Sequence, residues 1–548
     1  MADPLSDLRA TLHAAVEALG DGASAQEPTL ERPPRPEMGD YSTNAAMLLA
    51  PLRGEKPRDV AEALRESLAE TLGGQATKVE VAGPGFLNLH LTDGWHRRAV
   101  AGILEAGGEY GRAPAETRER VLVEFVSANP TGPLTAAGGR GAAFGDSLAR
   151  LFEATAQEVG REYLLNDVGG QVDRFAASIA ARMRGEEPPE DGYAGEYIAE
   201  LAAELADAGV DSADLGALAR RGTEAMRERI ATTLDRFGVH FDVWFSERTL
   251  HDAGAVDATV AEMRERGHVY DRDGAVWLRT TDSGDDKDRV LIRAGGEPTY
   301  FAADLAYHRD KIERGWERMV DPLGSDHHGY VPRMKAGMAA LGADPDRYEA
   351  PIMQLVQIIE GGERARMSKR KGEFVGLDEL IDDIGADAAR FFLLQRSHDT
   401  ALDLDLDLAR KESQDNPVYY VQYAHARICS ILRKAVEEGA AASEEAAAGA
   451  AGSGPALESP AEPAESALVR RLLEMPGEVA LAADRRAPHR LCAYAMATAA
   501  DFHSFYRDCQ VVGAAEDLQG ARLGICVATK RVIAGTLALL GVSAPERM

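Results

Sequence analysis

The sequence predicts a multidomain α/β protein built around a parallel-sheet core. Between Glu119 and Val375, short apolar runs rich in β-branched residues alternate with helical stretches, as expected for strands joined by crossover helices. Residues 1–112 mix helix and strand patterns, whereas residues 406–548 are helical in pattern almost throughout. We therefore expect an N-terminal α+β domain at 1–112, a parallel-sheet domain at 113–375, connecting helices at 376–405 and an all-α domain at 406–548.

The composition is that of a globular protein that buries a substantial core. Of the 548 residues, 28% are charged and 45% are hydrophobic. No apolar run approaches the ~18 residues that span a bilayer, and the amphipathic N-terminus carries acidic residues, unlike a signal peptide. We expect a monomeric, cytoplasmic protein with no membrane partner. The four cysteines lack metal-ligand spacing, which predicts buried reduced thiols and no metal site.

The net charge limits how the protein binds nucleic acid. A formal charge of −29 argues against broad, non-specific binding, because such binding depends on clustered Lys and Arg side chains. Any contact with RNA must therefore be local.

The N-terminal residues predict a small mixed domain. We expect helices at Leu5–Leu19 and Pro57–Leu72 and a strand around Lys78–Leu91, with a turn-rich stretch between the two helices.

The next stretch combines a strand, a loop and the start of a helix. The apolar run Val121–Val126 enters a Pro/Gly loop, and small residues then open a helix. The first turn of a helix presents unpaired N–H groups and the positive end of its dipole, which favours phosphate or carboxylate. Gly138, Gly139 and Gly141 allow a ligand to approach the backbone closely. The same pattern also occurs as a simple packing solution, so the stretch alone leaves both readings open.

The residues around this loop carry a family resemblance. The stretch from Glu124 to Asp146, EFVSANPTGPLTAAGGRGAAFGD, resembles the active-site loop of bacterial arginyl-tRNA synthetases, which are class I enzymes with a Rossmann-type core. In that family a HIGH signature follows ANPTGPL, but here its four positions read Thr-Ala-Ala-Gly, so both histidines are replaced. The resemblance implies that ATP binds at Thr135, Ala137, Gly138 and Gly139.

The N-terminal domain also resembles this family. The motifs GDYSTNAA and VEVAGPGFLNLHL are similar to the domain with which family members contact the tRNA elbow. This implies that Phe86 stacks on a D-loop base and that Asn88 reads a base edge. From the residues alone, a core Phe86 and a strand-end cap at Asn88 are equally acceptable. Residues 185–221 are expected to form an acidic helical insertion.

A third motif, TYFAADLAYH, lies at Thr299–His308 and is similar to the arginine-binding helix of the family. Tyr300 and Asp304 are four residues apart and therefore share one helix face. A guanidinium is a planar fork of donors, so its pocket needs well-placed carboxylates. We expect Glu124 and Asp304 to supply the charge, Tyr300 a wall and a phenol, and Asn129 a partner for the α-amino end. The alternative for Asp304 is an exposed helix acid.

Two adjacent histidines occur in GSDHHGY, residues 324–330. A zinc site needs three or four ligands, and no further His/Cys cluster lies nearby in the sequence. The resemblance instead implies that Asp326 and His327 lie beside the nucleotide and His328 beside the amino acid.

The basic stretch RMSKRKG, residues 366–372, follows a predicted strand at Ile352–Ile359 and resembles the KMSKS signature of class I enzymes. Cations that close over the phosphates stabilise the charge that builds up in the transition state. A solvated basic loop is the alternative. The resemblance implies catalytic roles for Arg366, Ser368, Lys369 and Lys371, and contact with ATP for Met367.

The C-terminal region contains DNPVYYVQYAHARICSIL, residues 415–432, which is close to the motif that opens the anticodon-binding bundle of the family. Part of its tyrosine set must be core, because three tyrosines occur at helical spacing. The resemblance implies tRNA contacts at Tyr420, Gln422, Arg427 and Met548, and we expect the Gln422 side chain on the exposed face. Residues 437–465 are predicted to be a flexible loop.

Taken together, the resemblance implies an arginyl-tRNA synthetase. Such an enzyme activates arginine with ATP and Mg²⁺, without a dedicated protein site for the metal, and transfers the arginyl group to tRNA-Arg. An alternative stays open, because the HIGH histidines are replaced. This alternative is a tRNA-binding paralogue whose activation step is lost or weakened.

Overall fold

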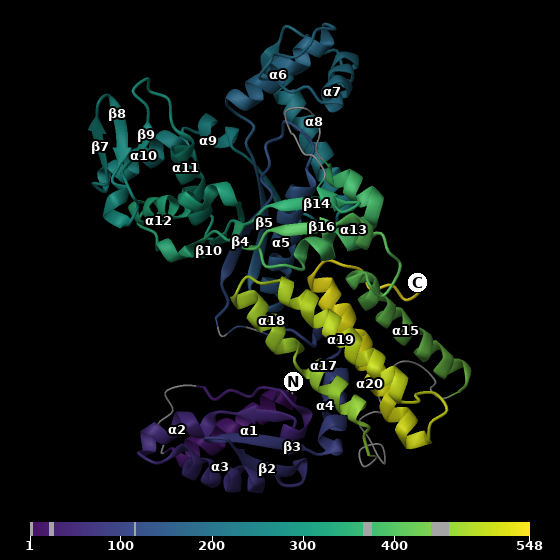
Figure 1. The fold of residues 1–548 in the computed structure, drawn as a ribbon. Coiled ribbons are helices and arrows are strands. Elements are labelled where there is room, and N and C mark those ends of the chain that lie inside the picture. The colour runs from purple at the N-terminus through teal and green to yellow at the C-terminus, as the bar shows by residue number, and fades with distance from the viewer. Residues whose placement is uncertain (1–3, 21–26, 114, 116, 365–374, 440–459) are drawn as a thin grey trace.

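The computed structural model describes residues 4–20, 27–113, 115, 117–364, 375–439 and 460–548. The predicted fold class is confirmed: an α+β domain lies at one end, a parallel-sheet core occupies the middle and a helical bundle follows (Figure 1). In the part of the chain that the structure describes, no helix is long and apolar enough to cross a membrane.

The N-terminal domain packs helices on a three-stranded antiparallel sheet of order β1-β3-β2. The predicted strand at 78–91 is in fact a hairpin, because Gly83 and Gly85 turn the chain with φ of 54° and 152°. The elements are α1 (Pro4–Leu19), β1 (Tyr41–Thr43), α2 (Ala45–Arg53), α3 (Pro57–Leu72), β2 (Ala76–Ala82), β3 (Phe86–Leu91) and the connecting helix α4 (Asp93–Ala106).

The core is a five-stranded sheet of order β12-β10-β4-β5-β6 in which all neighbours are parallel. The chain runs from β4 to β5 and β6 on one side and places β10 and β12 on the other side. The strand order therefore reverses between β4 and β10, where sheets of this kind bind ligands. The strands are β4 (Arg120–Glu124), β5 (Glu158–Leu165), β6 (Val243–Ser246), β10 (Arg318–Val320) and β12 (Tyr348–Glu349).

Helix α5 (Ala136–Ala154) follows β4 and packs against β4 and β5. The predicted insertion at 185–221 is helical in part, with irregular chain at 186–195 and 208–214. It contains α7 (Glu196–Asp207) and the start of α8 (Leu215–Arg236), and both pack on α6 (Gly170–Met183) at the end of the molecule opposite the N-terminal domain (Figure 1).

A smaller unit with its own hydrophobic core lies between β6 and β12. It combines the antiparallel sheet β7-β8-β9 with helices that include α11, which carries the TYFAADLAYH motif. Its elements are α9 (Arg248–Asp252), α10 (Ala255–Glu265), β7 (Val269–Arg272), β8 (Ala275–Leu278), β9 (Arg289–Ile292), α11 (Tyr300–Glu313), β11 (Leu323–Gly324), the 3₁₀ helix η5 (Ser325–Tyr330) and α12 (Val331–Ala340).

The predicted strand at 352–359 is divided into β13 and β14, and β14 pairs with β16 in a separate small sheet. The basic stretch 366–372 lies outside the described residues. Helix α13 follows it and packs against α5, so the predicted connecting segment belongs to the core. The elements are β13 (Ile352–Met353), β14 (Val356–Glu360), β15 (Glu363–Arg364), α13 (Leu377–Leu394), β16 (Leu402–Asp405) and α14 (Leu406–Ala409).

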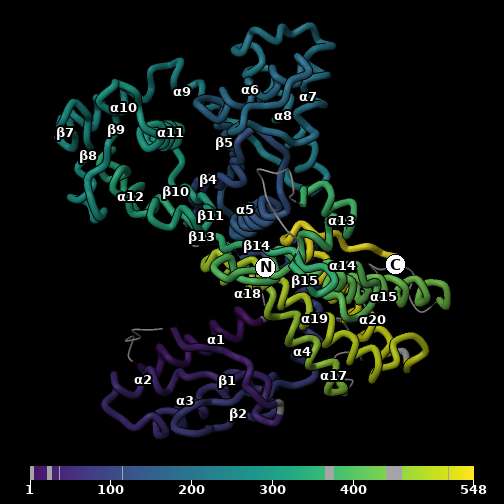
Figure 2. The backbone as a smooth tube through the Cα atoms, turned by 45° about the horizontal axis from the view of Figure 1, so that its top comes forward, coloured from purple at the N-terminus to yellow at the C-terminus, as the bar shows by residue number. Residues whose placement is uncertain are grey.

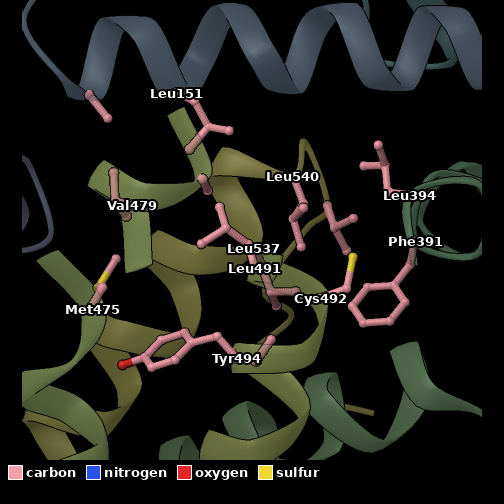
Figure 3. Close-up of a cluster of buried hydrophobic side chains, with 14 of the residues drawn as sticks. Leu151, Phe391, Leu394, Met475, Val479, Leu491, Cys492, Tyr494, Leu537 and Leu540 are labelled. Carbon is pink, nitrogen blue, oxygen red and sulfur yellow. The ribbon is translucent and has the colours of Figure 1, made fainter. Parts of the chain in front are cut away.

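The C-terminal bundle is joined to the parallel-sheet core by packed side chains. Leu151 of α5, Phe391 of α13, Met475 of α18 and Leu537 of α20 belong to one buried cluster (Figure 3). The four cysteines are buried and form no disulfide within the part of the chain that the structure describes, in line with the predicted reduced thiols. The helices are α15 (Pro417–Glu437), α17 (Pro463–Leu473), α18 (Met475–Asp484), α19 (His489–Asp508) and α20 (Glu516–Leu539).

The predicted loop at 437–465 extends too far. Its residues 440–459 lie outside the described part of the chain, but α17 already begins at Pro463. Glu465 is buried within α17, where it pairs with Arg97 of α4 and Arg522 of α20. The helices α4 and α17 lie side by side in two views, where the N-terminal domain meets the bundle (Figure 2).

Candidate active site

The switch point of the core sheet is occupied by a buried lysine. The ammonium of Lys311, on α11, lies 2.6 Å from the carboxylate of Glu124 at the end of β4. It also lies 3.3 Å from both oxygens of Asp321, which follows β10. Burial alone would lower the pKa of Lys311, but Asp321 and Glu124 outweigh it and raise that pKa above its ordinary value. Lys311 therefore stays charged and holds two neighbouring strands to one helix.

The second oxygen of Glu124 is also engaged. It accepts a hydrogen bond of 2.9 Å from the hydroxyl of Ser127, and this hydroxyl accepts one of 3.1 Å from the Leu164 N–H on β5. Val126 and Ser127 have left-handed backbones, with φ of 67° and 38°, which is a strained conformation for a β-branched valine. The loop is thus bent to fit around Glu124.

A cavity of about 430 Å³ lies beside the start of α11. Its lining includes Tyr300, which is 68% exposed, and Glu247, which follows β6 and is 7% exposed. The Glu247 N–H donates to the Leu165 carbonyl at 3.0 Å, which fixes it at the end of the sheet. Among the other lining residues are Gly169, Gly170, His251 and Ala303.

Two carboxylates in this region have raised pKa values. Burial and then the charge of Asp304 raise the pKa of Glu247. Burial also raises the pKa of Asp304, although the hydroxyl of Tyr330 donates to its carboxylate. A buried carboxylate with a raised pKa favours a bound cation, because a positive ligand offsets its lost hydration and the charge of nearby carboxylates.

The structure separates the predicted pair of guanidinium carboxylates. Glu124 does not line the cavity and is paired with Lys311. Glu247 lines the cavity, and Asp304, which follows the lining residue Ala303 but is not itself a lining residue, raises the pKa of Glu247. Sequence reasoning missed Glu247. The signal for it was present, since Glu247 directly follows the strand Val243–Ser246 and thus the carboxyl end of a parallel strand. Lys311 lies 187 residues from Glu124, so no local pattern reveals their pairing.

Asn129, predicted to meet the substrate α-amino group, is held in place by a second amide. Its side-chain NH₂ donates to the carbonyl oxygen of Gln171 at 2.6 Å. This bond orients the Asn129 amide, and its own carbonyl oxygen is the kind of acceptor that an ammonium requires.

At the start of α5, the Thr135 hydroxyl accepts the Gly138 N–H at 3.1 Å and so caps the helix, which leaves its own O–H as a donor. A Cβ at Gly139 would lie 2.7 Å from Leu377 on α13, so this glycine is required for helix packing. A Cβ at Gly138 would meet Thr135 and Leu134 only at 3.7 and 3.9 Å, and Ala137 is exposed. Space for a ligand therefore exists at Ala137 and Gly138.

Asp326, His327 and His328 are exposed on η5, after β10 and β11. The His327 ring lies 3.5 Å from the Asp326 carboxylate. Among the described residues, no three His, Cys, Asp or Glu side chains come together as a metal site. Arg366, Met367, Ser368, Lys369 and Lys371 lie outside those residues, so their roles stay predictions.

The candidate tRNA contacts of the N-terminal domain differ in exposure. Phe86 is 38% exposed, which suits a stacking side chain. Asn88 is 3% exposed and lies on β3, the central strand of its sheet. The role of Asn88 as a reader of a base edge therefore stays a prediction, and its burial on the central strand favours the structural alternative.

The candidates in the bundle also separate into two groups. Arg427 stacks over the rings of Tyr423 and Tyr506, each at 5.2 Å, and Met548 is 54% exposed. Tyr420 is half-buried against His503. The expected exposure of Gln422 is wrong. Its side chain is 9% exposed and donates to the Asp387 carboxylate and the Ser543 carbonyl, so it links α15 to α13 and to the end of the chain.

Comparison with known proteins agrees with this geometry. Residues 6–91 match the family described as arginyl tRNA synthetase N terminal domain, and residues 421–548 match the DALR anticodon binding domain. The chain is 45% identical to an arginine–tRNA ligase of Desulfitobacterium hafniense over 532 residues, which are 95% of this chain and 93% of that protein. It is 47% identical to one of Frankia alni over 531 residues, 95% and 94% of the two chains.

A solved structure shows the same fold. The arginyl-tRNA synthetase of Thermus thermophilus superimposes with a TM-score of 0.77 over 99% of both chains, at 23% sequence identity.

Proposed function

The chain belongs to the arginyl-tRNA synthetase family, which is part of class I of the aminoacyl-tRNA synthetases, and on this premise we propose that the cavity beside Tyr300 is its arginine site. The activity is the ATP-dependent joining of arginine to tRNA. Similarity to two arginine–tRNA ligases over 95% of the chain supports this activity, and nothing in it favours the alternative of a paralogue without activation.

The observation that carries the assignment of the cavity is the pair Glu247 and Asp304. Both carboxylates have raised pKa values, and each is fixed by the fold, Glu247 by its N–H bond at the end of the sheet and Asp304 by Tyr330. A guanidinium fits such a pair because its N–H donors lie in one plane and because it stays protonated, and therefore positively charged, at all relevant pH values. The exposed phenol of Tyr300 closes the cavity on one side.

The α-amino end of arginine then lies toward Asn129, whose amide is oriented by Gln171. We place His328 near the same end of the substrate. This arrangement directs the arginine carboxylate toward the α-phosphate of ATP, next to the open start of α5 at Ala137 and Gly138. Asp326, His327, Gly139 and Met367 complete the proposed nucleotide site, and Thr135 contributes by capping α5.

Activation forms a bond between a carboxylate oxygen of arginine and the α-phosphorus, and breaks the bond from that phosphorus to the oxygen of pyrophosphate. The N–H groups at the start of α5 and the cations Arg366, Lys369 and Lys371 stabilise the growing charge, with Ser368 beside them. Mg²⁺ accompanies ATP and reduces the charge on its phosphates, without protein ligands of its own. In the second step a terminal ribose hydroxyl of tRNA-Arg attacks the arginyl carbonyl carbon, and AMP leaves.

The tRNA would contact both ends of the molecule. We propose Phe86 for the elbow and Tyr420, Arg427 and Met548 for the anticodon. Aromatic and arginine side chains of this kind stack on unpaired bases. We further propose that the enzyme is a cytoplasmic monomer.

Substituting Glu247, which lines the cavity, and the neighbouring Asp304 tests the arginine site. We expect Glu247→Gln and Asp304→Asn each to raise the KM for arginine by about 30-fold or more, corresponding to at least ~2 kcal/mol for one lost partner of a buried charge. The matched control is Asp310→Asn, on the same helix α11 but on its half-exposed side, where it pairs with Arg314. An arginine KM that does not change in either Glu247→Gln or Asp304→Asn would contradict the assignment. Lys369→Ala, in contrast, should mainly lower kcat.

A further inference from the structure

A histidine accompanies Glu247 at the wall of the proposed arginine cavity. Glu247 is the residue before α9, and His251 lies four residues later, one turn along this short helix. The His251 Nε2 lies 3.6 Å from the Glu247 Oε1, and both residues line the cavity. The Glu247 side chain is 9% exposed and that of His251 is 34% exposed, so a buried carboxylate lies beside a partly exposed imidazole.

The other charged groups around this pair are mostly negative or already engaged. Asp304 faces Glu247 from α11, and Asp167, which follows β5, faces it from the sheet. Arg248 on α9 is directed to Asp167, with its Nε 3.7 Å from that carboxylate. Arg293 and Glu297 line the cavity from the loop after β9, where both are exposed.

We propose that His251 is a positioning residue of the arginine site, whose imidazolium keeps the Glu247 carboxylate ionised and turned into the cavity until arginine binds. This inference rests on the proposed function of the cavity. It explains how Glu247 stays ionised at the cavity wall although the charge of Asp304 acts on it. The guanidinium then meets a pair that is already charged.

The sign of the pH effect follows from the surroundings of Glu247. Burial, Asp304 and Asp167 raise its pKa, and His251 lowers it. Without His251 the carboxyl takes up a proton at a higher pH, and a neutral carboxyl pairs poorly with a guanidinium. The fall in arginine affinity on the acid side should therefore begin at a higher pH. If the imidazolium instead competed with arginine for Glu247, its loss would move this fall to a lower pH.

The test measures the KM for arginine in aminoacylation of tRNA-Arg, between about pH 5 and pH 8, where histidine side chains titrate. The variants are His251→Gln, which removes the cation, and His251→Lys, which supplies a permanent one. The matched control is His240→Gln. His240 pairs with Asp235, five residues earlier in the chain, at 2.9 Å, but this pair is exposed and His240 does not line the cavity.

We expect His251→Gln to move the acid limb of the KM profile upward by about one pH unit, the shift that an opposite charge at this distance produces. At the pH of the parent midpoint this corresponds to a KM about tenfold higher at most. The acid limb of the His251→Lys profile should lie at the same pH as that of the parent or at a lower pH. The His240→Gln profile should coincide with that of the parent. At the alkaline end both KM and kcat of the control His240→Gln should equal those of the parent, and the effect of His251→Gln should be on KM and not mainly on kcat.

An acid limb that stays in place or moves down in His251→Gln would overturn the inference. The variant Glu247→Gln separates this failure from a failure of the proposed function. If Glu247→Gln raises the arginine KM while His251→Gln leaves the limb unchanged, only the role of His251 is wrong. If Glu247→Gln leaves the KM unchanged, the cavity is not the arginine site.

Discussion

At the scale of single residues, the site depends on which carboxylates are already paired with a cationic side chain of the protein. Lys311 is fully buried between Glu124 and Asp321, and His308 lies 3.1 Å from Asp321. These groups satisfy one another, so the negative charge that remains for a ligand is that of Glu247 and Asp304. The same helix, α11, carries both Lys311 and Asp304, and therefore couples the switch point to the cavity.

Removing the buried lysine should destabilise the protein strongly. We expect Lys311→Met to lower the free energy of unfolding by about 3–5 kcal/mol, because two buried carboxylates lose their cation. The control is Lys335→Met, since Lys335 pairs with Asp346 at a similar distance of 2.8 Å on the surface, where such pairs contribute about 0–1 kcal/mol. Urea unfolding at neutral pH measures both. Equal losses in the two variants would show that the Lys311 cluster is not a structural centre.

Sequence reasoning succeeds at this scale where partners are near one another. The spacing of Tyr300 and Asp304 placed both on one face of a helix, and they are now found at one end of α11. It failed for Glu124, whose partner is 187 residues away, and for Gln422, whose partner Ser543 is 121 residues away. Whether a polar side chain is free depends on such distant contacts, which a single sequence does not encode in any local pattern.

At the scale of elements, α5 has two different functions along its length. Its first turn is capped by Thr135 and leaves space at Gly138, as a phosphate-binding helix start requires. Farther along, Gly145 lets α5 approach β4, because a Cβ there would lie 2.2 Å from the ring of Phe125. Some glycines in the pattern that suggested a nucleotide site are thus explained by close packing of α5.

Two glycines of α5 allow a matched test. Gly145→Ala should destabilise the protein by about 1–3 kcal/mol, since the added methyl overlaps Phe125 in a packed core. Gly141→Ala, with nothing within 4 Å of the added methyl, should stabilise it by about 0.5–1 kcal/mol, because alanine favours a helix over glycine. Thermal unfolding of both variants measures the difference. Similar Tm shifts in the two would contradict the packing described for α5.

The elements themselves were largely predictable. The helix Pro57–Leu72 and the parallel core follow from apolar periodicity and were predicted with nearly the observed bounds. The errors occur at turns. The strand predicted at 78–91 is divided by Gly83 and Gly85, whose positive φ makes a hairpin of one apolar run. Short strands such as β13 and β14 also merged into one in the prediction, because their residues are equally apolar across the break.

At the scale of the whole molecule, the N-terminal domain and the helical bundle are fastened to one another through buried charges. Glu465 of α17 pairs with Arg97 of α4 and Arg522 of α20, with side chains between 1% and 9% exposed. Nearby, Asp40 at the start of β1 interacts with His96 of α4 and Arg470 of α17. The N-terminal domain is therefore held to the bundle as well as to the core, which suits a ligand that contacts both.

The contact at Asp40 predicts a specific dependence on pH. Burial alone would raise the pKa of Asp40, but His96, the Leu91 N–H and Arg470 outweigh it and lower that pKa to about 2. Because the folded pKa is depressed, the contribution of Asp40 is present above its unfolded value near 4 and is lost as the pH falls toward 2. Asp40→Asn should therefore cost about 2 kcal/mol at pH 7 and progressively less below about pH 4.

Unfolding by urea at several pH values measures this difference between parent and Asp40→Asn. The control is Asp346→Asn, whose exposed carboxylate pairs with Lys335, and no comparable loss is expected from it. A stability difference between parent and Asp40→Asn that stays constant from neutral to acid pH would show that the charge of Asp40 does not fasten the domain.

The central claim is that this chain charges tRNA with arginine through a pocket built for a cation. The most direct measurement is aminoacylation of tRNA-Arg by the purified protein with ATP, comparing arginine with citrulline, which has nearly the same shape but no charge. We predict that kcat/KM for arginine exceeds that for citrulline by at least about 10³-fold, because an uncharged ureido group leaves Glu247 and Asp304 buried without a cation. Equal charging of the two amino acids, or binding of tRNA-Arg with no charging at all, would contradict the account.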